Sequence, residues 1–168
     1  MQPDRGVIFV ATGTKYRSEA LINVALSSPY LSNLKSCLIT DKIISSESSV
    51  FDIVKYHPSP VFSYRDKISG LVDLPFEYNL FLDSDAFLSA SPYSLFQLLS
   101  IFDFAATHAP VRHPPGWSDP VVPVSFPEFN SGVMLLKRTK GTTVLLRNWL
   151  SLYDALFEKH NQEWDQAS

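Results

Sequence analysis

Two carboxylates, Asp83 and Asp85, are separated by one residue and directly follow the apolar run 78–82. In an extended chain, residues i and i+2 point to the same side, so both carboxylates face one way and Ser84 faces the other. Like charges this close repel each other and raise one pKa unless a cation lies between them. Mg²⁺ and Mn²⁺ take oxygen ligands and share their remaining positions with phosphate. The pattern indicates a metal site that neutralises a departing diphosphate, with an idle acidic turn as the alternative.

The elements that must position these carboxylates follow from the hydrophobic pattern. Short apolar runs predict strands over residues 6–11, 37–40, 50–56, 78–82, 102–106 and 131–136. Helices are predicted over residues 17–28, 64–71, 91–99 and 142–160. This alternation predicts an α/β fold: one Rossmann-like domain over residues 1–168, with a mainly parallel sheet flanked by helices. Ligands of such sheets bind at the carboxyl ends of the strands, where Asp83 and Asp85 lie.

Finer features of three helices and one loop can also be predicted. Ser91 and Pro92 supply an N-cap and a first-turn proline for the helix over residues 91–99. Helical spacing predicts that two apolar stripes face the core: Leu21, Val24, Ala25 and Ser28 in the first helix, and Leu145, Trp149, Leu152 and Leu156 in the last. Residues 109–127 hold six of the twelve prolines, which predicts a long, stiffened binding loop.

The composition narrows the class of protein. With 168 residues, 45% hydrophobic and 18% charged, the chain can bury one core. A net charge of −3 without a basic cluster argues against a nucleic-acid partner. The apolar runs are much shorter than the roughly 20 residues of a membrane span, and the N-terminus lacks a secretory signal pattern. We therefore expect a cytoplasmic protein, with the single cysteine, Cys37, as a buried thiol.

Several segments resemble one enzyme family. Residues 78–87 are similar to the metal-binding segment of the GT-A nucleotide-diphospho-sugar transferases, and residues 129–136 resemble the next block of glycosyltransferase family 8. That family includes glycogenin-like and lipopolysaccharide galactosyltransferase-like enzymes. Asp165-Gln166 resembles the family's Asp-Gln pair, and Lys67 occupies the place of a basic residue that contacts the donor. The first-strand segment 10–12, followed by Tyr16, resembles the part that holds uracil and ribose.

This resemblance covers nearly the whole chain and implies a GT-A fold. It implies transfer of a hexose from a UDP-sugar to an acceptor hydroxyl with retention of anomeric configuration, assisted by Mn²⁺ or Mg²⁺ on Asp83 and Asp85. Asp165 and Gln166 would orient the sugar and stabilise charge at its anomeric carbon. The implied donor contacts are Ala11, Thr12, Gly13, Tyr16, Lys67, Ser84, Asn130 and Ser131. The donor sugar remains open, as does the acceptor, which could be a sugar, a lipid-linked glycan or a protein.

The sequence departs from the family in one respect that affects activity. The resemblance implies a third metal ligand, a histidine downstream of the Asp-Gln pair, in a C-terminal segment that this sequence does not contain. Two carboxylates alone would then hold the ion, and it would bind weakly without nucleotide. This departure leaves open a non-catalytic or truncated nucleotide-sugar-binding domain. The Asp-x-Asp motif leaves open a second alternative, a haloacid-dehalogenase-like phosphatase, because that family also carries Asp-x-Asp after an apolar strand.

Overall fold

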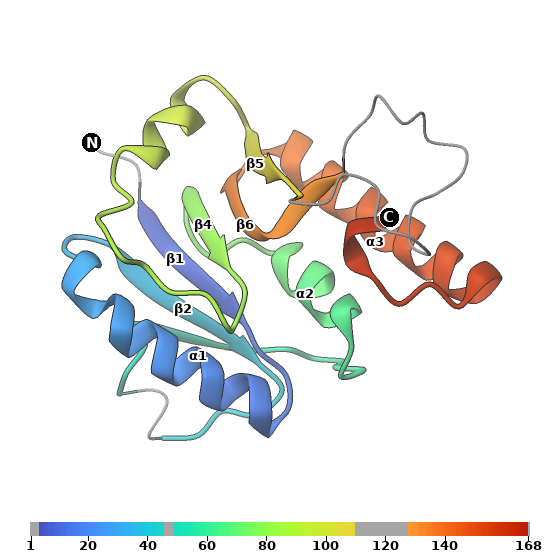
Figure 1. Ribbon diagram of the computed structural model, residues 1–168, viewed down its shortest axis with the longest axis horizontal. Coiled ribbons are helices and arrows are strands. Elements are labelled where there is room, and N and C mark those ends of the chain that lie inside the picture. The colour runs from blue at the N-terminus through green and yellow to red at the C-terminus, as the bar shows by residue number, and fades with distance from the viewer. Residues whose placement is uncertain (1–3, 46–48, 110–127, 168) are drawn as a thin grey trace.

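A computed structural model describes residues 4–45, 49–109 and 128–167. Its longest helices are α1 (Thr14–Ser27), α2 (Tyr64–Leu71) and α3 (Lys140–His160), and three short 3₁₀ helices accompany them: η1 (Ser28–Tyr30), η2 (Leu95–Ser100) and η3 (Asp165–Ala167). The strands are β1 (Arg5–Val10), β2 (Lys35–Thr40), β3 (Ile53–Tyr56), β4 (Tyr78–Leu82), β5 (Phe104–His108) and β6 (Phe129–Lys137). Figure 1 shows their arrangement.

The described strands form one sheet in the order β3-β2-β1-β4-β6-β5. The pairs β1–β2, β2–β3 and β1–β4 are parallel, which confirms the predicted α/β architecture. β6 runs antiparallel to both β4 and β5, an orientation that the strand pattern did not predict. The chain builds outward from β1 to β3 and then returns to the other side of β1 with β4. The connection that follows β1 therefore runs toward β2, and the connection that follows β4 runs in the opposite direction, toward β5. Such a switch point leaves a crevice at the carboxyl ends of β1 and β4.

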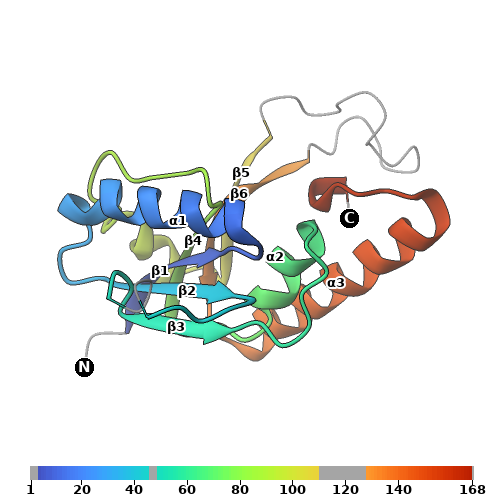
Figure 2. The same cartoon turned by 90° about the horizontal axis from the view of Figure 1, so that it is seen from below.

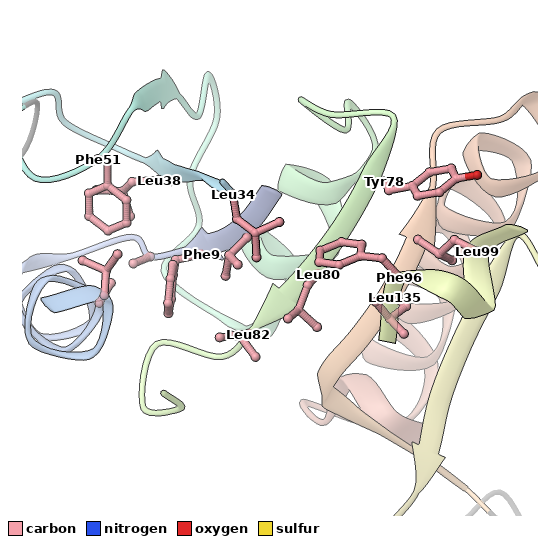
Figure 3. Close-up of a cluster of buried hydrophobic side chains, with 14 residues drawn as sticks. Phe9, Leu34, Leu38, Phe51, Tyr78, Leu80, Leu82, Phe96, Leu99 and Leu135 are labelled. Atoms are coloured by element: carbon pink, nitrogen blue, oxygen red, sulfur yellow. The ribbon is translucent and has the colours of Figure 1, made fainter. Parts of the chain in front are cut away.

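Helices cover both faces of this sheet: α1 lies on one face, and α2 and α3 lie on the other (Figure 2). A hydrophobic cluster lies on each face of the sheet, and alternating residues of β1 pack into one or the other because successive strand side chains point to opposite faces. Val7 and Phe9 join the cluster on the α1 side, together with Phe96 of η2 (Figure 3). Ile8 joins the opposite cluster with Cys37, and burial there raises the pKa of the Cys37 thiol to about 12. The prediction of a buried thiol is therefore confirmed.

The predicted stripe of α1 is correct at Leu21 and Val24, which pack against the core, and wrong at Ala25 and Ser28, which are exposed. The helix begins at Thr14, and its buried residues include three with polar side chains, Arg17, Asn23 and Ser27. Asn23 donates from Nδ2 to the carbonyl oxygen of Ser84 (2.6 Å), and Ser27 accepts from the backbone N–H of Leu88 (2.9 Å). Buried polar groups are tolerated when they are hydrogen-bonded in this way. The predicted stripe therefore missed the polar part of the buried face.

The predicted stripe of α3 is correct at Trp149, which packs against the core, and wrong at Leu145 and Leu152. Leu145 and Leu152 are 44% and 49% exposed, whereas Leu146 and Tyr153 are buried. The sequence of α3 is rich in apolar residues, so several helical stripes match the expected spacing. Packing against the sheet and α2 decides which of these stripes is buried. None of the described helices combines the length and the apolar character that a membrane span requires.

Element boundaries agree closely for α2, whose predicted bounds are confirmed, with Ser63 as the N-cap accepting from the backbone N–H of Arg65 (3.2 Å). The helix predicted over residues 91–99 is instead the 3₁₀ helix η2, which begins at Leu95. Pro92 lies in the turn before it, where its carbonyl accepts from the backbone N–H of Leu95 (2.9 Å). The proline-rich segment predicted over residues 109–127 lies, apart from Ala109, outside the described residues.

Candidate functional site

An open cleft of about 990 Å³ lies where β1 and β4 end. Lys15, Tyr16 and Glu19 of α1 line one side, and the loop before α2 contributes Val61, Phe62 and Ser63. Asp83, Ser84 and Asp85 line the cleft after β4, and α3 contributes Tyr153 and Phe157. The predicted carboxylate pair therefore lies in an open cleft at the switch point, as the sequence pattern indicates.

Asp83 is held in place by the β6 strand beside it. Its backbone N–H donates to the carbonyl oxygen of Gly132 (2.8 Å), which continues the β4–β6 ladder by one residue. A Cβ at Gly132 would lie 2.8 Å from Asp83 Oδ2 and 3.1 Å from Asn130 Oδ1. Asn130 in turn accepts from the backbone N–H of Gly132 (2.8 Å). Glycine at this position therefore makes the space that the Asp83 carboxylate occupies.

A buried network connects Asp83 to the end of the chain through Lys67. Lys67 Nζ lies 2.9 Å from Asp83 Oδ1 and 2.8 Å from Asp165 Oδ2. The hydroxyl of Ser131 donates to Asp165 Oδ2 (2.7 Å) and accepts from Lys67 Nζ (3.2 Å). Lys67 is 9% exposed and Asp165 is 2% exposed, so both charges are withdrawn from water. Three residues distant in the sequence, each of them a predicted donor or sugar contact, therefore share one network with Asp83.

Burial and the neighbouring charges shift the pKa values of both Lys67 and Asp83. Burial alone would lower the pKa of Lys67, but the charges of Asp165 and Asp83 outweigh it and raise that pKa. Burial raises the pKa of Asp83, and although Lys67 opposes this, the nearby Asp165 and Asp85 add to it. The site therefore keeps its lysine charged while disfavouring negative charge on Asp83. A cation near Asp83 would relieve that disfavoured charge.

The position of Asp165 depends on α3. After α3 the chain turns back at Asn161, which has left-handed backbone angles (φ 52°, ψ 36°), and η3 contacts both β6 and α2. Trp149 Nε1 donates to the backbone carbonyl of Asp165 (2.9 Å), and the Tyr153 hydroxyl donates to that of Glu163 (3.1 Å). Two side chains of α3 therefore fix the returning segment. Gln166, the second residue of the predicted pair, is half-buried within η3.

The predicted first-strand contacts differ in their exposure. Ala11 and Thr12 are buried, and the Thr12 hydroxyl donates to Asp66 Oδ2 (2.6 Å). Gly13 has φ +81°, a left-handed value that favours glycine, and its N–H donates to Asp41 Oδ1 (2.7 Å). Tyr16 is 47% exposed and lines the cleft. This segment therefore offers Tyr16 to a ligand, while the side chain of Thr12 is engaged within the protein.

The side chain of Ser84 faces α1, away from the two carboxylates that flank it. Its hydroxyl donates to Glu19 Oε2 (3.0 Å), and its carbonyl oxygen accepts from Asn23 Nδ2 (2.6 Å). These contacts attach the turn after β4 to α1. The turn that carries Asp83 and Asp85 is therefore braced from one side by α1 and from the other by β6.

The residues present fit a hard divalent cation that keeps some ligands from phosphate and water. Asp83 is half-buried beside the space at Gly132, and Asp85 is exposed in the same cleft. Within the described residues, no group of three or more His, Cys, Asp or Glu side chains is placed to hold a metal ion. Mg²⁺ is commonly bound by one or two carboxylates together with substrate phosphates, so two suffice.

Three contributors to the site were missed by the sequence analysis: Asp66, Asp41 and Arg17. Asp66 is 2% exposed and accepts from Thr12 and from the backbone N–H groups of Val61 and Phe62 (both 2.8 Å). A signal for it existed, because Ser63 followed three residues later by an acid is a capping-box pattern. Asp41 pairs with Arg17 Nη1 (3.0 Å), and the hydrogen bonds from Gly13 and Arg17 overcome the effect of burial and lower the pKa of Asp41.

No family model matches the sequence, and no curated protein sequence matches it significantly. Solved structures do match the fold. The glycosyltransferase GlyE of Streptococcus pneumoniae TIGR4 superposes with a TM-score of 0.65 at 20% identity, over 99% of this chain and 42% of GlyE. The galactosyltransferase LgtC, in complex with donor and acceptor sugar analogs, gives 0.67 at 12% identity, over 96% of this chain and 68% of LgtC.

A third match is mouse xyloside xylosyltransferase 1 in its apo form, with a TM-score of 0.56 at 17% identity. It covers 98% of this chain and 79% of the mouse chain. This chain therefore spans less than half the length of GlyE and roughly two thirds to four fifths of the other two. At these identities the likeness concerns the fold, and it agrees with the architecture expected from the Asp-x-Asp segment. The chain has the GT-A fold of the nucleotide-diphospho-sugar transferases.

Proposed function

We propose that this chain is a metal-dependent glycosyltransferase domain that moves a hexose from a UDP-sugar to an acceptor hydroxyl with retention of configuration. The observation that carries the proposal is the position of Asp83 and Asp85. They follow β4 at the switch point of a GT-A sheet and line an open cleft, with the buried charge of Lys67 2.9 Å from Asp83. The binding of donor and acceptor sugar analogs by LgtC, which shares this fold, supports a donor in that cleft.

Each residue of the network has a proposed part in donor binding. Asp83 and Asp85 hold Mn²⁺ or Mg²⁺, which when bound neutralises charge on the diphosphate leaving group. Lys67 supplies a second positive charge beside the phosphates or a sugar hydroxyl. Asp165 is turned toward Lys67 and Ser131, so we assign it the positioning of Lys67. Gln166 and Asn130, both half-buried, are the proposed contacts to the hexose.

A calorimetric titration tests this proposal directly. UDP is added to the protein in the presence and absence of Mn²⁺, and a panel of UDP-sugars is then screened for metal-dependent hydrolysis or transfer. We expect UDP to bind measurably tighter with the ion, because the carboxylates and the diphosphate share it. Equal UDP affinity with and without Mn²⁺ and Mg²⁺ would overturn the proposal.

A second candidate function is that of a nucleotide-sugar-binding domain without transfer activity. The chain spans 42% of GlyE and 68% of LgtC, so parts of those proteins have no counterpart in this sequence. The two functions differ in turnover alone. Ion-dependent binding of a UDP-sugar that is neither transferred nor hydrolysed would support the binding domain, whereas release of UDP over time would support the transferase.

The Gly132→Ala variant is expected to lose ion-dependent UDP affinity by about tenfold or more. The added methyl would lie 2.8 Å from Asp83 Oδ2, closer than real contacts allow, so the carboxylate must move away from its present position. Displacing a metal ligand by even a fraction of an ångström weakens binding at a site that demands regular geometry, as Mg²⁺ sites do. Calorimetry with UDP and Mg²⁺ measures this loss.

The matched control is Gly141→Ala in the first turn of α3. Its added methyl would meet Asp103 and Thr139 at 3.6 Å, an ordinary contact, so UDP affinity should stay at the wild-type value. Unchanged affinity in Gly132→Ala, with a folded protein, would mean that Asp83 does not need its present position.

A further inference from the structure

The loop before α2 holds a bulky residue in an unfavourable backbone conformation. Phe62 has φ +58°, in the left-handed region that residues with large side chains rarely adopt. Its ring is nevertheless 60% exposed and lines the cleft. The conformation therefore does not serve to bury the ring in a core. Strained residues whose surroundings hold them in place concentrate at ligand-binding sites.

Asp66 is the group that holds Phe62 in this conformation. The Asp66 carboxylate is 2% exposed and accepts from the backbone N–H groups of Val61 and Phe62, each at 2.8 Å. The same oxygen that binds Phe62, Oδ2, also accepts from the hydroxyl of Thr12 at 2.6 Å. One buried carboxylate thus ties the loop to the segment that follows β1. The backbone of Phe62 is thereby fixed relative to the first-strand segment.

The Phe62 ring lies beside the start of α1. A Cβ built on Gly13 would be 3.5 Å from Phe62 Cδ1, so the ring contacts the turn that leads into the helix. Tyr16 follows Gly13 by three residues, is 47% exposed and lines the same cleft. Two exposed aromatic side chains from different segments therefore line the cleft next to one glycine turn.

We propose that Phe62 is a base-binding residue: its ring stacks on the nucleobase of the donor nucleotide and, with Tyr16, forms an aromatic subsite for that base. The inference rests on the proposed function, since it requires a nucleotide in the cleft. A planar base gains from stacking on an exposed aromatic ring, and the gain does not depend on which base it is. Because Asp66 fixes the backbone before the ligand arrives, only the side-chain rotamer of Phe62 has to be ordered on binding.

The test compares Phe62→Gly with Phe62→Tyr, using UDP and pyrophosphate as probes, each titrated with Mn²⁺ by calorimetry. Glycine accepts φ +58° without strain, so Phe62→Gly removes the ring while leaving the loop free to keep its path. We expect Phe62→Gly to weaken UDP binding about tenfold and to leave pyrophosphate binding unchanged. Phe62→Tyr, which keeps a ring, should restore UDP binding to within about twofold of the wild type.

A control variant in the same cleft is Phe157→Ala, whose side chain is 45% exposed and lines the cleft from α3 instead of from the loop before α2. It should bind UDP like the wild type. Wild-type UDP affinity in Phe62→Gly would overturn the inference while the proposed function stands. Equal losses for UDP and pyrophosphate would also overturn it, because Phe62 would then act through the shape of the loop. If the wild type binds UDP no better with Mn²⁺, the proposed function itself fails.

Discussion

Replacing Asp83 with asparagine is expected to reduce Mn²⁺-dependent UDP affinity by at least about a hundredfold. Asparagine keeps the shape of the side chain but removes the charge that binds the ion, and even residues that only orient metal ligands are worth about 10- to 100-fold. Asp85→Asn should show a loss of similar size, because the exposed Asp85 carboxylate is the second of only two proposed ligands. Calorimetric titration with UDP at fixed Mn²⁺ measures both.

The Asp83→Asn variant should at the same time remain folded. Burial raises the pKa of Asp83, and Asp165 and Asp85 add to this despite the opposing charge of Lys67, so the fold disfavours a charge at position 83. Lys67 keeps its ion pair with Asp165 at 2.8 Å. A neutral side chain should therefore leave the free energy of unfolding within about 1 kcal/mol of the wild type, or raise it.

Glu158→Gln is the matched control for charge in the cleft. Glu158 lines the cleft from α3, is exposed and is not one of the proposed ligands. Its replacement by glutamine subtracts one negative charge from the cleft and leaves both proposed ligands in the sequence. A loss of UDP affinity as large as that of Asp83→Asn would show that general charge in the cleft, and not a specific ion site, governs binding.

The sequence could predict those parts of the site that depend on local pattern. The apolar run 78–82 followed by Asp83 and Asp85 predicted both a central strand and its functional edge, because a strand buried on both faces has few polar residues until it ends. The bounds of α2 follow from the N-cap at Ser63. Such signals lie within a few residues of the feature they specify.

Features that depend on contacts between distant residues could not be predicted. The capping-box pattern at Ser63 points to Asp66, but it does not indicate the hydrogen bond between Asp66 and the distant Thr12. The antiparallel direction of β6 depends on how the chain passes between β5 and β6, which strand patterns do not specify. The family resemblance suggested Lys67, Ser131 and Asp165 separately, as ligand contacts. Only the fold reveals that they contact one another before any ligand is considered.

That mutual contact leads to the largest expected effect on stability. Replacing Lys67 with methionine, which is similar in length and uncharged, removes the ammonium group that lies 2.8 Å from the buried Asp165 carboxylate. Removing one partner of a buried ion pair typically costs about 3–5 kcal/mol, because the remaining charge has neither water nor a counter-charge. We expect Lys67→Met to lose about that much free energy of unfolding in urea denaturation followed by circular dichroism. Adding Asp165→Asn should recover part of the loss.

The pH dependence of the same experiment identifies the charge of Lys67 as the cause. The pKa of Lys67 is raised above its ordinary 10.5, so the folded protein holds this proton more tightly than the unfolded chain does. The resulting stability is complete below about pH 10.5 and is lost as the pH rises through the folded-state pKa. The difference between the wild type and Lys67→Met should therefore narrow above pH 10.5.

Lys55→Met provides the comparison for an ion pair that is open to water. Lys55 pairs with Asp73, whose side chain is 87% exposed, and such surface pairs contribute about 0–1 kcal/mol. If Lys67→Met cost no more than Lys55→Met, the Lys67–Asp165 pair could not be the buried anchor of the site. The position of Asp165 would then have to depend on the hydrogen bonds from Trp149 and Ser131. A loss several times larger in Lys67→Met would instead show that the cation holds the end of the chain against the sheet.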